Sequence, residues 1–75
     1  MNNTVFCVSF LEDNMFAEIT ISGDIEELFD FQTKSNIFPQ KVIFADENVL
    51  VGLFSKDNGG KIVKWLQKNG AKYQK

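Results

Sequence analysis

The sequence has no His, and its eight basic residues are all Lys, so it has no Arg either. Without His it lacks the usual proton shuttle and the commonest metal ligand. Without Arg it lacks the planar clamp that binds carboxylates or phosphates through two hydrogen bonds. Its single Cys can form neither an internal disulfide nor a Cys-based zinc site. An enzyme is therefore the least expected class, and we predict no catalytic residue, no metal and no cofactor.

Long hydrophobic runs are also missing. The longest apolar run, residues 49–54, is far too short to span a bilayer. The first four residues, Met-Asn-Asn-Thr, have neither the basic nor the apolar segment of a secretory signal. We therefore expect a cytoplasmic protein with no membrane partner. An all-Lys basic set with seven Asn is typical of an AT-rich genome, such as that of a low-GC bacterium or its phage. A phage protein would work in the host cytoplasm.

The chain has 75 residues, of which 44% are hydrophobic and eight are Phe. This length predicts a single domain over residues 1–75 with one core. So short a chain without disulfides is expected to be only marginally stable as a monomer. A homodimer would bury more apolar surface, and we keep it as an alternative.

Periodicity predicts an α+β fold with the element order ββαββα. Runs of β-branched and aromatic residues predict four strands, at 4–11, 15–22, 41–45 and 49–55. Asp24 and Glu27 have the spacing of a capping box, which predicts a helix from there to about Asn36. A second helix is expected from about Gly60 to Asn69, ended by Gly70, with a frayed tail after it.

The expected sheet is four-stranded and mostly antiparallel, packed with the two short helices. The first and fourth runs are apolar on both faces, which favours them as central strands in the β-grasp-like order 2-1-4-3. An alternative comes from a repeat, because residues 10–17 resemble residues 44–51. Two ββα units at 4–36 and 41–70 would instead give the order 1-2-4-3 or 2-1-3-4.

Charge is unevenly distributed along the chain, although the net charge is only −2. Residues 1–33 contain seven acids and no Lys, whereas residues 34–75 contain eight Lys and three acids. Six of the acids are expected to present a negative face to a partner: Glu12, Asp13, Glu18, Glu26, Glu27 and Asp30. Solubility, turns and the helix dipole are the structural alternative for these acids.

Four lysines, Lys61, Lys64, Lys68 and Lys72, are spaced three, four and four residues apart, which predicts one basic face on the second helix. Such a face would bind phosphates or an acidic partner, or would simply be solvated. Trp65 and Phe38 are candidate aromatic anchors, with burial in the core as the alternative for Trp65. Cys7 is expected to be a small buried hydrophobe.

These features favour a non-catalytic protein-binding module, a small inhibitor or adaptor that blocks its partner sterically and electrostatically. A phage-encoded inhibitor of a host defence or nuclease system would have this size and composition. One alternative is a nucleic-acid or phosphate-binding factor that uses the Lys-rich helix, although the absence of Arg makes it less expected. Another is a structural subunit that acts by homo-oligomerising. No motif points to a known family.

Overall fold

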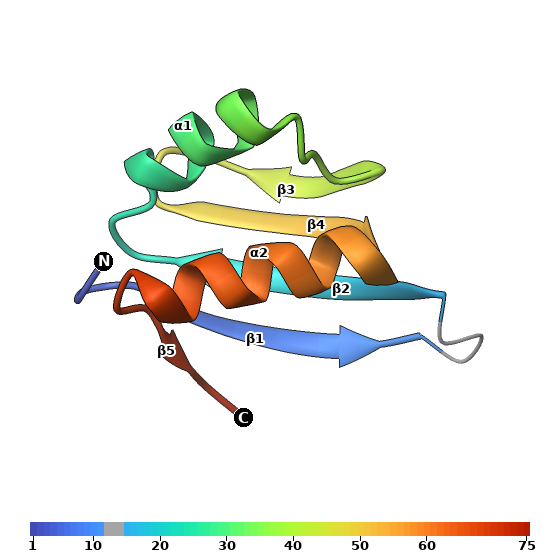
Figure 1. The fold of residues 1–75 in the computed structure, drawn as a ribbon. Coiled ribbons are helices and arrows are strands. Elements are labelled where there is room, and N and C mark those ends of the chain that lie inside the picture. The colour runs from blue at the N-terminus through green and yellow to red at the C-terminus, as the bar shows by residue number, and fades with distance from the viewer. Residues whose placement is uncertain (12–14) are drawn as a thin grey trace.

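The computed structural model describes residues 1–11 and 15–75, so the expected turn at 12–14, with Glu12 and Asp13, lies outside the described residues. Five strands and two helices follow one another along the chain (Figure 1). In order they are β1 (Val5–Phe10), β2 (Phe16–Ser22), α1 (Glu26–Ser35), β3 (Lys41–Ala45), β4 (Val49–Ser55), α2 (Lys56–Lys68) and β5 (Lys72–Tyr73). The predicted α+β class with two helices and a mostly antiparallel sheet is confirmed.

The strands form one sheet in the order β3-β4-β2-β1-β5. All neighbours are antiparallel except β1 and β5, which are parallel. Figure 1 shows α2 lying across the sheet, and α1 contributes to the same core. The two helices also contact each other, because the rings of Phe31 and Trp65 stack with centroids 4.5 Å apart. The molecule therefore has two layers, with both helices on one side of the sheet.

The core lies between that side of the sheet and the helices. In β2 and β4 every second residue is buried, as expected of strands that have one covered face. Ile19 and Ile21 of β2 and Phe54 of β4 are fully buried, as are Ile62 and Leu66 of α2. Each such side chain contributes roughly 1.5–3 kcal/mol through burial. Packing against α2 therefore holds the central strands in place.

The other face of the sheet has no helix over it among the described residues. Cys7, Thr20, Val51 and Phe44 lie side by side across this face, on neighbouring strands from β1 to β3. Cys7 is exposed there, so the prediction that it is buried is wrong. Its position in the strand alternation directs its side chain away from the helices, opposite to that of its neighbour Phe6.

The preferred strand order, 2-1-4-3, is wrong. Among the first four strands the order is β1-β2-β4-β3, one of the two orders expected from a repeat; the duplication itself remains a prediction. Polar Glu18 and Thr20 make β2 resemble an outer strand in sequence, yet β2 lies between β4 and β1. Since helices cover only one face of this sheet, even its central strand needs only one apolar face.

The sheet has five strands rather than four, because the last residues are not a frayed tail. The backbone N–H of Lys72 donates to the Thr4 carbonyl at 2.9 Å, and that of Gln74 donates to the Phe6 carbonyl at 2.8 Å. These bonds place β5 beside β1. The signal was weak in the sequence because a two-residue strand has no periodicity.

The first helix begins later than predicted. Its N-cap residue is Ile25, and no side-chain hydrogen bond caps it, so the predicted capping box is wrong. The backbone carbonyl of Asp24 instead accepts a hydrogen bond of 2.8 Å from the buried hydroxyl of Thr4. Phe29 of this helix is 37% exposed.

The second helix begins four residues earlier than predicted. Ser55 is its N-cap, with its hydroxyl oxygen accepting from the Asn58 N–H at 3.2 Å. Residues 56–59, which precede the predicted start, therefore belong to the helix. Gly70, with φ of 94°, follows the helix end as predicted. Within the described ranges, neither helix has the length and apolar character needed to cross a membrane.

Two glycines provide a test of this fold. Replacing Gly60 with Ala should raise the free energy of unfolding by about 0.5–1 kcal/mol, because Ala suits a helix interior and a Cβ there meets no atom within 4 Å. Replacing Gly23 with Ala should lower it by at least about 2 kcal/mol, because its φ is 117° and a Cβ would clash with the Asn3 carbonyl. Urea unfolding measures both. A stabilised Gly23→Ala variant would contradict the conformation of the β2–α1 connection.

A buried amide provides a second test. Gln32 is 4% exposed, and its Nε2 has no hydrogen-bond partner among the described residues. Gln32→Met should therefore raise the free energy of unfolding by about 1 kcal/mol, because it removes an unpaired buried donor at similar volume. The matched control is Gln67→Met on the exposed side of α2, expected within about 0.5 kcal/mol of the parent. Destabilisation by Gln32→Met would show that the amide is paired in solution.

Candidate functional site

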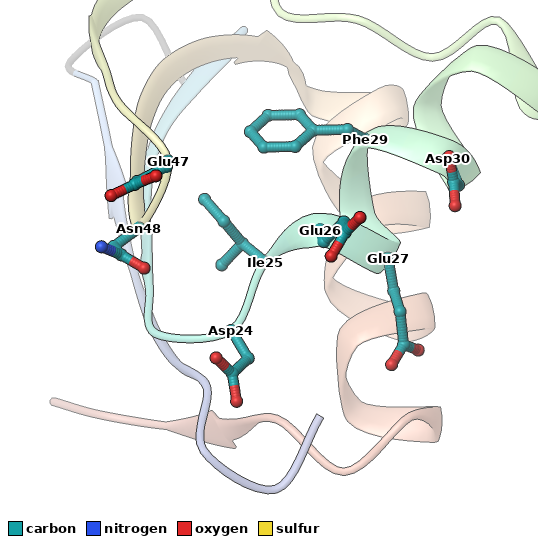
Figure 2. A pocket seen from close by; sticks show the side chains of 8 residues that line it. All are labelled: Asp24, Ile25, Glu26, Glu27, Phe29, Asp30, Glu47 and Asn48. Carbon is teal, nitrogen blue, oxygen red and sulfur yellow. The ribbon is translucent and has the colours of Figure 1, made fainter.

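The described residues form two hollows of similar size but different character. We call the first, of about 690 Å³, the acidic hollow. It is lined by Asp24, Ile25, Glu26, Glu27, Phe29, Asp30, Glu47 and Asn48 (Figure 2). We call the second, of about 700 Å³, the lysine groove, and it runs between β1 and α2. The first hollow is lined by five acids and no Lys, whereas the second is lined by three Lys and one acid, Asp57.

The acidic hollow joins the start of α1 to the turn between β3 and β4. The turn is held by Asp46, whose Oδ1 accepts from the N–H groups of Asn48 and Val49 at 2.8 Å each. The carbonyl of Asn48 accepts from the Gly23 N–H at 2.9 Å, which ties the turn to the residues before α1. Glu47 is thereby brought opposite the acids of α1, far from them in sequence.

The acids of this hollow are spread around it rather than converging on one point, as Figure 2 shows. Among residues 1–11 and 15–75, no group of three or more His, Cys, Asp or Glu is arranged to hold a metal ion. Glu26 and Glu27 occupy the first turn of α1, where negative charge is favoured by the helix dipole. Helix stabilisation therefore explains much of this acidic cluster.

The lysine groove combines an apolar floor with a basic rim. Its apolar lining comes from the sheet and the helix: Val8, Phe10, Ala17, Ile19, Val63 and Tyr73. Lys56, Lys61 and Lys64 of α2 lie along it, and so does one acid, Asp57. Phe10 is 62% exposed and Tyr73 is 51% exposed, so much of this apolar surface is in contact with water. A ligand that supplied an apolar side chain and negative charge would match both parts.

The groove adjoins an open length of sheet edge. Strand β5 pairs with β1 only at Val5 and Phe6, so within the described chain the ladder stops before residues 7–10. Since the carbonyls of Thr4 and Phe6 bond to β5, alternation directs the backbone groups of Val8 and Phe10 to the same outer edge. The side chains of these two residues line the groove. Backbone hydrogen-bonding groups and an apolar floor therefore lie together.

The predicted acidic face is only partly assembled. Glu26, Glu27 and Asp30 lie together in the acidic hollow. Glu18 lies apart from them, in the middle of β2, where it pairs with Leu53 and Ser9 across the uncovered sheet face. Glu12 and Asp13 fall outside the described residues. The predicted acidic face does not include Asp24 and Glu47, which also line the hollow. Glu47 could not be predicted from the sequence, because only the folded β3–β4 turn brings it near α1.

The predicted basic face is also divided. Lys61 and Lys64 line the lysine groove, and Lys68 ends α2 outside the groove lining. Lys72 lies in β5, so the prediction that all four lysines share one helical face is wrong for this residue. The helix ends before it, at Gly70. Lys56 also lines the groove, because α2 begins four residues before its predicted start.

The two aromatic candidates differ in exposure. Trp65 is half-buried, stacked on Phe31 between the two helices, and so contributes to the helix–helix contact. Phe38 is 50% exposed in the segment between α1 and β3. The aromatic residues that do line the lysine groove are Phe10 and Tyr73, which were not singled out. Their position beside α2 depends on tertiary packing and cannot be predicted from local sequence patterns.

Comparison with protein-family models, curated proteins and solved structures finds no match to this chain.

Proposed function

We propose that this chain is a non-catalytic protein-binding module, a small inhibitor or adaptor, and that it binds an extended acidic segment of its partner in the lysine groove. The observation that carries the proposal is the meeting of an apolar floor, a lysine rim and an open strand edge at one place. Each part suits a different feature of a peptide.

The open edge supplies backbone recognition. A segment in extended conformation can add to a sheet as a further strand, and its main-chain hydrogen bonds then contribute to affinity. The edge-facing groups of Val8 and Phe10 are available for such a strand, because the pairing with β5 has ended before them. The bound segment would continue the sheet beyond the short β5.

The groove supplies side-chain recognition. Alternate side chains of an added strand would point toward the helix side of the sheet, between Phe10 and Val63. A large apolar side chain would cover these surfaces, and acidic side chains would lie near Lys61 and Lys64. Charge complementarity of this kind raises association rates and selects among partners. The module would block whatever contact the captured segment makes in its own protein.

A single-stranded nucleic acid is the competing occupant, because bases stack on aromatic side chains while lysines hold the phosphates. Phe10 and Tyr73 are both exposed beside the lysines of the groove. A protein segment is favoured for two reasons: the chain has no Arg, and only a peptide can use the open backbone of β1.

The proposal predicts a particular selection outcome. A displayed library of random linear peptides, selected on the full chain, should yield sequences rich in Asp and Glu around a large apolar residue. Binding of a selected peptide, followed by fluorescence anisotropy, should weaken about tenfold or more in the double variant Lys61→Glu/Lys64→Glu, because attraction at the rim becomes repulsion. Phe10→Lys should weaken it similarly by removing part of the floor.

Lys68→Glu is the matched control, since it makes the same change on the same helix outside the groove lining, and it should change affinity less than about threefold. Selection of basic peptides would point to the acidic hollow instead. Tight, salt-sensitive binding of a single-stranded oligonucleotide, with no peptide enriched, would replace the proposal by a nucleic-acid function.

A further inference from the structure

The edge of the sheet opposite the lysine groove is formed by β3, which has a neighbour on one side only. All five of its residues are exposed. A strand at a sheet edge presents unpaired backbone N–H and C=O groups, which can pair with another strand. Among the described strands, none pairs with the outer side of β3.

This edge also carries a concentration of exposed apolar side chains. Val42 is 52% exposed, Ile43 49% and Phe44 53%, and they follow one another without interruption. Phe38, which precedes the strand, is 50% exposed. Edge strands are commonly protected by charged residues or bulges. Here a bulge between Val42 and Phe44 is present, but no charge interrupts the apolar run.

We propose that β3 is a self-association surface, at which a second copy of this chain pairs its own β3 in antiparallel orientation. Charge favours this occupant: β3 begins at Lys41 and is followed directly by Asp46 and Glu47. In an antiparallel pair the start of one strand lies beside the end of the other. Each Lys41 would thus lie near the acids that follow the partner's β3.

Two-fold symmetry makes such a pair self-limiting. The same surface is used by both copies, so the dimer leaves no further β3 edge open. The two five-stranded sheets would join into one continuous sheet, with a β5 at each outer edge. The inference is independent of the lysine groove, which lies at the opposite edge.

The available surface predicts a weak dimer. Four half-exposed side chains offer roughly 350 Å² per copy, since a buried Phe covers ~150–250 Å² in full. A standard stable interface buries roughly 800 Å² per partner. With the added backbone hydrogen bonds, we expect a dissociation constant on the order of 100 µM.

Sedimentation velocity from about 10 µM to about 1 mM, a range that brackets this affinity, should show a reversible shift from monomer to dimer. Ile43→Lys should weaken association at least tenfold, because it places charge at the centre of the apolar run. The matched control is Phe10→Lys, an exposed apolar residue on β1, which should dimerise like the parent. Circular dichroism verifies that both variants are folded.

A charge exchange tests the antiparallel direction. Lys41→Glu and Glu47→Lys should each weaken the dimer about threefold or more, and the double variant should restore it. Restoration cannot arise within one chain, because Lys41 and Glu47 lie at opposite ends of the five-residue β3, roughly 15 Å or more apart. Asp46 is avoided because its carboxylate holds the β3–β4 turn.

A chain that stays monomeric up to about 1 mM would overturn the proposal, since the expected dissociation constant lies about tenfold below that concentration. Dimerisation of Ile43→Lys with the affinity of the parent would also overturn it, by showing that another surface associates. Failure of the double charge variant to recover would overturn the antiparallel arrangement.

Discussion

The packing of α2 across β2 and β4 is the contact on which the rest of this fold depends. Ile62 and Leu66 are fully buried there, and they meet strand residues such as Ile19 and Phe54 that are equally buried. A chain of 75 residues with two short helices can cover only one side of its sheet. This one-sided arrangement leaves one face of the sheet uncovered and forms the groove beside α2. Because the sheet is open, it also has two edges. Each of these features leaves surface available for contacts.

The fold turns an asymmetry of sequence into an asymmetry of surface. Four acids of the first half, Asp24, Glu26, Glu27 and Asp30, gather at the start of α1, where the β3–β4 turn adds Glu47 to them. Four of the eight lysines of the second half extend along α2, three of them beside the apolar floor between this helix and β1. The two hollows are nevertheless unequal as binding sites. The acids of the acidic hollow are explained largely by the stability of the helix and the turn. In the lysine groove, by contrast, the large aromatic side chains of Phe10 and Tyr73 remain exposed to water.

Local features of the fold could be predicted from the sequence, and long-range ones could not. Strands β3 and β4 have the predicted ends, because alternating apolar residues and the intervening acidic turn are local signals. The start of α2 was misplaced because Gly59 and Gly60 favour a loop by propensity, whereas the Ser55 cap and packing override it. Strand order and β5 depend on partners distant in sequence. For the same reason Lys61 and Lys64 were found as candidates, while the groove floor and the open edge of β1 were not.

The central claim is that recognition occurs where β1 and α2 meet. Backbone amide chemical-shift mapping, with the isotope-labelled full chain saturated by an acidic peptide selected on it, tests this location most directly. The largest changes should fall on residues 7–10 of β1 and on the first turns of α2, with slowed hydrogen exchange at the edge-facing amides of Val8 and Phe10. Changes centred on Asp24–Asp30, or confined to the uncovered sheet face around Thr20 and Val51, would contradict it.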